Sequence, residues 1–321
     1  MRNEKGFALI LTLIVTALMV ALAAELMHQV YVDTSISRNF RDGQQATILA
    51  ESGIAAAKSM LQMVAPSRQY TSLSDMAMLA TLVNRSDETG SITVTVVEED
   101  GKINLNGLVQ PNGSYEPNTL TVLKRLGTRI AHPVTDPKAW DNLAAWLDPN
   151  SPPVSGGADT PYYQTLQPPY KARKGKLATI EELSMVKGFT PEIVADLRPY
   201  VTVYSQLSLA SFAKININMA PKMVLAALSD QMTNGMIDRV VNEHQTDPNN
   251  PFKAVGELSK VPGLETIANE LPGMIDVIGH TYRITAVGQV RDSARTVDAV
   301  VRISGMSGMP GMSGILSWRE Y

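Results

Sequence analysis

The sequence predicts an α+β fold, in which a long N-terminal helix packs on a small antiparallel sheet and a large α-helical domain is inserted into that sheet. Three observations predict it: an apolar N-terminal run that continues into a helical pattern, two alternating segments far apart in the chain, and a helical section between them. The chain has 321 residues, a net charge of −3 and no cysteine. The small charge gives no general attraction for polyanions, and the missing thiols exclude disulfides and thiolate metal sites.

The N-terminal segment predicts one helix over residues 7–62. Residues 7–24 form an uncharged run of 18 residues, which is long enough to cross the hydrocarbon core of a membrane. The helical pattern then continues past Glu25, and no proline occurs before Pro66. A cleaved secretory signal and a plain signal anchor are the alternatives, because small residues near Ala24 loosely fit a signal-peptide cleavage site.

Two segments with alternating apolar residues predict β-hairpins. In residues 91–106 the expected turn is at 98–101, and in residues 282–304 it is at 291–293. Since these hairpins lie at opposite ends of a long middle section, they predict one sheet that an inserted domain interrupts. The C-terminal stretch Ser-Trp-Arg-Glu-Tyr is expected to add a last strand, after a mobile Gly/Ser/Met linker over 304–314.

The middle section, 112–278, predicts short helices separated by proline and asparagine. They are expected at 118–127, 138–146, 179–186, 191–197, 221–228, 234–243 and 255–260. Two stretches, 180–197 and 255–271, share Glu-Leu-Ser, a valine and a glycine, and so resemble a helix-hairpin-helix repeat. Because Glu265 stands where such a hairpin would hold a phosphate, DNA binding is disfavoured, and plain packing of helix pairs is the simpler interpretation.

No motif indicates an enzyme. The four histidines, His28, His132, His244 and His280, are not paired at ligand spacing. The sequence also has no nucleophile elbow, phosphate-binding loop or dinucleotide fingerprint. We therefore expect a protein without catalytic residues.

The N-terminus resembles the class III signal that prepilin peptidase cuts in type IV pilins and pseudopilins. Gly6-Phe7 follows a short basic leader and precedes the apolar run, and residues 46–61 resemble the second half of a pilin helix. The resemblance implies cleavage between Gly6 and Phe7, methylation of the new N-terminus and retention of the apolar run. A side chain at Gly6 would obstruct the close fit of the peptidase to the backbone. Relatives usually carry Glu at the fifth mature position, where this chain has Leu11.

The missing glutamate is typical of the large minor pseudopilin K of type II secretion systems, and segments 102–108, 146–189 and 214–228 resemble that family as well. The resemblance implies a structural subunit at the tip of a periplasmic pseudopilus, which initiates its assembly for export across the outer membrane. The implied partners are minor pseudopilins I and J, then H and the major pseudopilin, prepilin peptidase and the inner-membrane assembly platform, and no nucleic acid. A minor pilin of a type IV pilus and a membrane-anchored DNA-binding protein are the alternatives.

The same resemblance implies a domain organisation. It gives a leader over 1–6, the long helix over 7–62 with 7–24 transmembrane, a pilin-like β domain in two parts over 63–111 and 279–321, and the inserted domain over 112–278. The protein is expected to cross the bacterial inner membrane once, with its N-terminus cytoplasmic and its C-terminal domain periplasmic.

One loop of the inserted domain offers oxygen ligands for a metal ion. Asp148, Asn150 and Asp159 lie in a stretch rich in proline and glycine, and the Asp-x-Asn spacing suits calcium. The K family is associated with calcium in its inserted domain, so the resemblance implies calcium and no other cofactor. Where relatives tend to carry Gly-Ala-Glu-Asp, residues 157–160 read Gly-Ala-Asp-Thr, which loses one carboxylate and shortens another. A solvated turn loop is the alternative.

Overall fold

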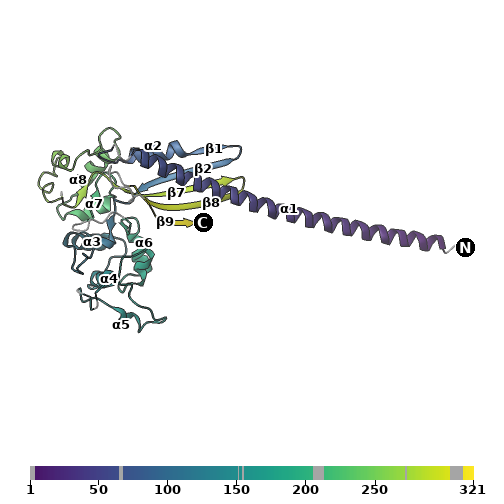
Figure 1. The fold of residues 1–321 in the computed structure, drawn as a ribbon, viewed down its shortest axis with the longest axis horizontal. Helices are drawn as coiled ribbons and strands as arrows, with labels where there is room; N and C mark the ends of the chain where they lie inside the picture. The colour runs from purple at the N-terminus through teal and green to yellow at the C-terminus, as the bar shows by residue number, and fades with distance from the viewer. Residues whose placement is uncertain are drawn as a thin grey trace.

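The computed structural model describes residues 4–64, 68–150, 152–153, 155–204, 213–271, 273–303 and 314–321, with side chains from Phe7 onward. It shows a protruding helix, an antiparallel sheet that lies along the inner end of this helix, and a helical domain beyond the sheet (Figure 1). Of the linker predicted over 304–314, residues 304–313 lie outside the described residues, and Gly314 begins the last strand.

The long helix that the sequence predicts is present as α1 (Glu4–Val64), with 61 residues. Its N-terminal part extends away from the rest of the molecule (Figure 1), and every residue of 7–34 is exposed. Its C-terminal part lies on the sheet. The side chains buried there follow helical spacing, and they are Ala46, Ala50, Ile54, Ala57 and Leu61.

Small residues let α1 approach the sheet closely. Ala46 and Ala50 are fully buried, and they face Gly288 of strand β7. A Cβ atom at Gly288 would stand 2.0 Å from the backbone oxygen of Ala46 and 2.7 Å from the backbone nitrogen of Ala50. Glycine is therefore the residue that permits this contact between helix and strand.

Within the described residues, the sheet has five antiparallel strands in the order β1-β2-β7-β8-β9. These strands are β1 (Arg85–Asp87), β2 (Gly90–Glu98), β7 (Thr281–Val290), β8 (Ser293–Arg302) and β9 (Gly314–Glu320). The β7–β8 hairpin and the last strand are both confirmed. Strands β2 and β7 are neighbours, although residues 99–280 separate them, so the prediction of a sheet interrupted by an inserted domain is confirmed.

The predicted hairpin over 91–106 is wrong. After β2 the chain turns at the expected place, but strand β3 (Ile103–Asn104) pairs in parallel with β4 (Val201–Thr202) inside the inserted domain. The turn residues Glu99 and Asp100 explain the difference, because their side chains are buried and bonded to other parts of the chain. They direct the chain out of the sheet, and β2 pairs with β1 and β7 instead.

Helix α2 (Leu73–Val83), which is not among the helices predicted from the sequence, lies beside α1 and β2. Its N-terminus has a capping box formed by Ser72 and Asp75. Together α1, α2 and the inner face of the sheet enclose one apolar core.

The inserted domain has its own core and consists of short helices, as predicted. They are α3 (Pro117–Arg129), α4 (Ala139–Leu147), α5 (Thr160–Tyr163), α6 (Pro191–Leu197), α7 (Lys222–Leu228), α8 (Asn234–Arg239), a π-helical turn Val240–Gln245, and 3-10 helices at Leu105–Gly107, Glu181–Met185 and Val255–Lys260. Trp146 and Tyr163 are fully buried in this core, with ring centroids 5.1 Å apart in an edge-to-face arrangement.

Two units of the inserted domain share one plan. In the first, the backbone nitrogen of Asn106 donates to Oδ1 of Asn104, and the Asn106 side chain bonds the backbone of Leu177 and Val203. This asparagine joins the start of the unit to its end, where β3 pairs in parallel with β4. Gly188, at φ 94°, makes the turn before α6.

The second unit repeats these contacts. Asn218 donates its backbone N–H to Oδ1 of Asn216, and its side chain bonds the backbone of Phe252 and Val277. Strand β5 (Ile215–Asn216) pairs in parallel with β6 (Ile275–Asp276), and Gly263 turns at φ 93°. The similarity of 180–197 and 255–271 thus has a structural basis. The helix-hairpin-helix detail is not confirmed, because a 3-10 helix opens each stretch and hydrogen-bonded turns follow Gly263.

Candidate functional site

The exposed half of α1 is the first candidate site. By length and composition this helix is apolar enough to cross a membrane, with a mean hydropathy of 2.7 in its most apolar 18-residue window. Gly6 and Phe7 lie in its first turns, and the Leu11 side chain is exposed on its surface. The cleavage between Gly6 and Phe7 and the role of Leu11 stay predictions, because the fold of a single chain tests neither processing nor assembly.

The second candidate is the junction between the sheet and the inserted domain. Glu98, the last residue of β2, is 4% exposed. Its Oε1 accepts a hydrogen bond of 2.6 Å from Asn216 Nδ2, and its Oε2 accepts one of 2.6 Å from the Thr71 hydroxyl. Burial and the nearby Asp100 raise the pKa of Glu98 to about 8, although the two hydrogen bonds oppose this shift. Burial thus favours the neutral form of Glu98.

The next two side chains, Glu99 and Asp100, are also bonded: Glu99 to two positively charged side chains, and Asp100 to two backbone N–H groups. Asp100 Oδ2 accepts hydrogen bonds from the backbone nitrogens of His280 and Thr281, at 2.6 and 2.7 Å. Burial opposes ionisation of Glu99, but Lys102 and Arg283 lower its pKa below the usual value. Their nitrogens lie 3.1 and 2.8 Å from Glu99 Oε1. The chain passes between the sheet and the inserted domain twice, after β2 and before β7, and these contacts bond the two segments to each other.

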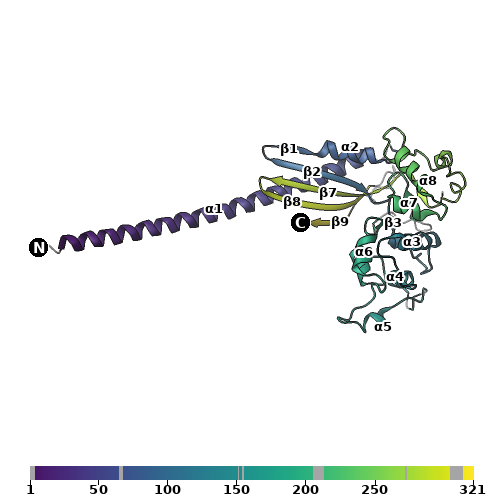
Figure 2. The same cartoon turned by 180° about the vertical axis from the view of Figure 1, so that it is seen from behind.

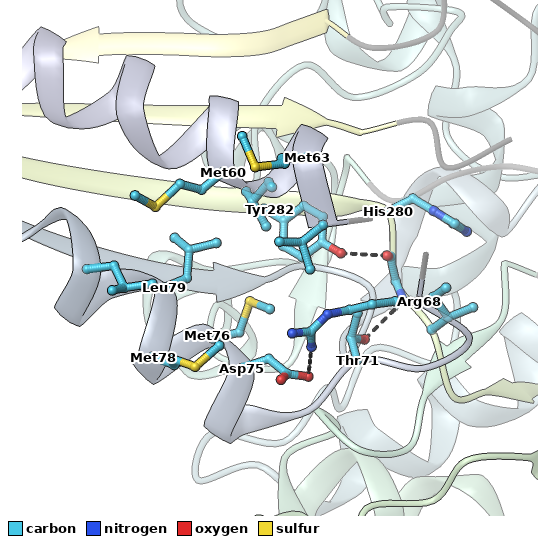
Figure 3. A pocket seen from close by; sticks show the side chains of 15 residues that line it. Met60, Met63, Arg68, Thr71, Asp75, Met76, Met78, Leu79, His280 and Tyr282 are labelled. Carbon is cyan, nitrogen blue, oxygen red and sulfur yellow. Dashed lines mark hydrogen bonds and ion pairs between the residues drawn. The ribbon is translucent and has the colours of Figure 1, made fainter. Parts of the chain in front are cut away.

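An apolar groove of about 230 Å³ opens next to this junction, between α1, α2 and residues 278–282. Figure 3 shows methionines of α1, Met60 and Met63, across from Met76 of α2. The ion pair of Arg68 with Asp75 lies at one end. Methionine side chains adopt many shapes, so the walls of the groove can adjust to an apolar group.

The third candidate is the loop predicted to bind calcium. Asp148 ends α4 and is buried, and its Oδ1 accepts two hydrogen bonds from Asn150, from the backbone nitrogen at 2.9 Å and from Nδ2 at 2.7 Å. Asp159 caps α5, and its Oδ1 lies 2.6 Å from Lys174 Nζ. The same ammonium donates to the backbone oxygen of Asn150 at 3.0 Å. The structure therefore brings the three predicted residues into one chain of contacts, with Lys174 between Asn150 and Asp159.

These residues do not fit a calcium ion as they stand. Calcium requires six to eight oxygen ligands, and Lys174 already takes two of the oxygens with a positive charge. Among the described residues, no group of three or more His, Cys, Asp or Glu side chains is arranged to hold a metal ion. Calcium binding itself stays a prediction.

Two of the four histidines have clear structural contacts instead. His132 Nδ1 lies 2.9 Å from Asp196 Oδ2, and the His244 ring stacks on Phe252 with centroids 4.0 Å apart. His28 lies on the exposed part of α1.

Neither Glu98 nor Lys174 is indicated as a site residue by the sequence pattern. Glu98 lies at the start of the predicted polar turn, and only its alternation with Val94 and Val96 points to the buried face of the strand. Lys174 is far from the three predicted ligands in sequence. Its neighbour Gly175 was a weak signal of a turn, and the backbone of Lys174 does adopt a left-handed conformation with φ 55°.

Comparison with known proteins agrees with this architecture. Two models of the family described as "Type II secretion system (T2SS), protein K" match residues 101–206 and 215–277, which correspond to the two units of the inserted domain. Type II secretion system protein K of Aeromonas hydrophila is 24% identical over 321 residues and covers 93% of each chain. The protein K of Pseudomonas aeruginosa is 26% identical over 235 residues, covering 71% of this chain and 68% of its own length.

A solved structure shares the fold. A chain of the crystal structure of the GspK-GspI-GspJ complex from the enterotoxigenic Escherichia coli Type 2 Secretion System superposes with a TM-score of 0.69 at 19% identity. The match covers 89% of this chain and 99% of that one. With the long N-terminal helix, the interrupted sheet and both matched units in place, the chain belongs to the type II secretion system protein K family of minor pseudopilins.

Proposed function

We propose that this chain is the tip subunit of a pseudopilus, where it initiates assembly with minor pseudopilins I and J. The observation that carries the proposal is the position of the inserted domain. It lies beyond the sheet, at the end of the molecule opposite the N-terminus (Figure 2). In a fibre whose subunits pack their α1 helices side by side, the subunit ahead, toward the tip, would occupy that space. A chain with this domain can end such a fibre but cannot easily repeat within it.

Leu11 supports the same position. In pilin-like fibres the glutamate at the fifth mature position is expected to pair with the N-terminal amine of the subunit ahead. A tip subunit has no subunit ahead, so a carboxylate at this position would be buried in an apolar environment without a partner. Leucine avoids that cost. Leu11 is exposed in the isolated chain, as a residue that first meets lipid and later partner helices would be.

The choice of I and J as partners is supported by the structural relative, whose crystal structure is a complex of GspK with GspI and GspJ. We infer that the exposed part of α1 and the neighbouring sheet contact these partners after extraction from the membrane. We infer four further partners: minor pseudopilin H, the major pseudopilin, prepilin peptidase and the inner-membrane assembly platform. The subunit would act structurally and not as a catalyst, with its globular part in the periplasm.

Co-purification tests the proposal. A C-terminally tagged full-length chain, extracted from membranes in mild detergent, is expected to retain I and J in stoichiometric amounts. A matched variant with Leu22→Glu, which places a charge on the exposed apolar part of α1, should lose them or fail to insert. Recovery of a homogeneous assembly of this chain alone, with neither I nor J, would overturn the proposal.

A further inference from the structure

The loop that the sequence assigns to calcium carries a built-in cation. Lys174 Nζ lies 2.6 Å from a carboxylate oxygen of Asp159 and 3.0 Å from the backbone oxygen of Asn150. Both are hard oxygen donors of the kind that calcium selects. The two oxygens come from separate turns of the loop, one after α4 and one at the start of α5, so the ammonium joins parts that a metal ion would otherwise join.

The backbone is arranged for this contact. Lys174 has φ 55°, a left-handed conformation that is uncommon for a residue with a long side chain. The backbone nitrogen of the next residue, Gly175, donates to the oxygen of Trp146 at 3.2 Å, which ties the turn to the end of α4. The Lys174 and Asp159 side chains are only 21% and 15% exposed, so solvent screens their attraction less than that of a surface pair.

We propose that the Lys174 ammonium replaces calcium in this chain, so that the loop is closed by an internal ion pair and does not require a metal. The charge of Asp159 is already balanced by Lys174. A calcium ion would have to sit within a few ångströms of the ammonium, and the two positive charges would repel each other. Asp148 does not favour calcium over the ammonium, because its Oδ1 already accepts hydrogen bonds from the side-chain amide and the backbone N–H of Asn150.

The proposal predicts that one substitution converts the loop into a metal site. In Lys174→Asn the ammonium is removed, a side-chain oxygen is added, and asparagine tolerates the left-handed backbone. Lys174→Gly removes the ammonium without adding a ligand and accepts the same φ. Lys176→Asn, two residues on and exposed, is the matched control, because it removes an equal charge outside the loop contacts.

The experiment uses the full-length protein in detergent, melted with about 1 mM calcium, the range that weak extracellular calcium modules need, or with a chelator. Calcium uptake is measured in parallel by titration calorimetry. The wild type and Lys176→Asn should show the same unfolding temperature in both conditions and no uptake. Lys174→Asn should unfold at a lower temperature than wild type in chelator, and should recover with calcium while taking up one ion.

Two results would overturn the proposal. One is a wild type that calcium stabilises, with the effect abolished by Asp159→Asn, since the metal would then bind despite the ammonium. The other is the absence of calcium uptake in both Lys174→Asn and Lys174→Gly while their circular dichroism spectra match that of the wild type. In that case the loop oxygens are not arranged for a cation, and Lys174 forms an ordinary ion pair.

Discussion

Asn216 donates a hydrogen bond of 2.6 Å from its Nδ2 to Oε1 of Glu98, and so joins the second unit of the inserted domain to the last residue of strand β2. Residue 98 is where the chain leaves the sheet for the inserted domain. The Thr71 hydroxyl bonds both Glu98 and, as acceptor, Asn216 Nδ2, which closes a buried triangle of polar groups. This buried network joins the inserted domain to the sheet.

Glu98 makes the stability of the protein depend on pH. Its folded pKa of about 8 lies above the ordinary value of 4.5, so the unfolded chain releases the proton first as the pH rises. The stabilisation is therefore fully present below about pH 4.5 and is lost as the pH rises to about 8. We expect the free energy of unfolding to be lower at about pH 8.5 than at about pH 5, and Glu98→Gln to remove most of that difference.

Denaturant unfolding of the full-length protein at the two pH values measures this effect. The matched control is Glu88→Gln, in the exposed turn between β1 and β2, which should behave like the wild type. Glu99 does not interfere, because its lowered pKa affects stability only below about pH 4.5. An unchanged pH dependence in Glu98→Gln would show that Glu98 is ionised at neutral pH.

Gly288→Ala is expected to destabilise the protein by about 1–3 kcal/mol, because the added methyl group overpacks the contact of β7 with α1. The methyl carbon would stand 2.0 Å from the Ala46 oxygen, so the helix must move away from the sheet. Gly235→Ala is the control, since a Cβ there meets no atom within 4 Å. Chemical denaturation midpoints of the two variants should differ, and equal midpoints would place α1 farther from β7 than the structure does.

Asn218→Ala is expected to cost about 2–4 kcal/mol, because it removes the hydrogen bonds that the Asn218 side chain makes with the buried backbone N–H and C=O of Phe252. Asn106→Ala in the first unit should cost a similar amount, since Asn106 makes the equivalent contacts to Leu177 and Val203. Asn249→Ala, on an exposed turn, serves as the control. A large effect for one buried asparagine and none for the other would contradict the shared plan of the two units.

Processing gives a prediction that does not depend on stability. If prepilin peptidase cuts after Gly6, the mature chain in the membrane begins at Phe7 and carries one added methyl group. Intact-mass analysis of the extracted protein measures this directly. A mature chain that begins near Glu25 would instead indicate an ordinary signal peptide, and it would lack the apolar part of α1 that the proposed assembly requires.

Much of the fold could be predicted from local sequence. The run from Phe7 and the alternation in β7 and β8 are strong periodic signals, and the β7–β8 hairpin follows from its two-residue turn at Arg291 and Asp292. The sequence did not predict the pairing partner of β3, the strand that follows β2. Turn chemistry indicates that the chain changes direction, but the parallel pairing of β3 with β4 depends on contacts of Asn106 with residues 71 and 97 positions away.

The candidate site shows the same limit. The sequence indicated that Asp148, Asn150 and Asp159 share a loop rich in oxygen donors, and the structure places them in one chain of contacts. It could not indicate that Lys174 reaches between two of them, because the contact depends on how the loop folds back on the end of α4. A charge that neutralises a predicted metal site is visible only in three dimensions.

The position of the chain in the pseudopilus is tested most directly by crosslinking single cysteines along α1. The natural chain has no cysteine, so Leu22→Cys or Phe40→Cys introduces one reactive group, and the unmodified chain is the control. Both side chains are well exposed, at 62% and 70%. In assembled pseudopili with single cysteines on the facing helices of the other subunits, a tip subunit should crosslink to I and J and never to a second copy of itself. Crosslinked dimers of this chain, at a yield like that of the major pseudopilin, would contradict the tip assignment.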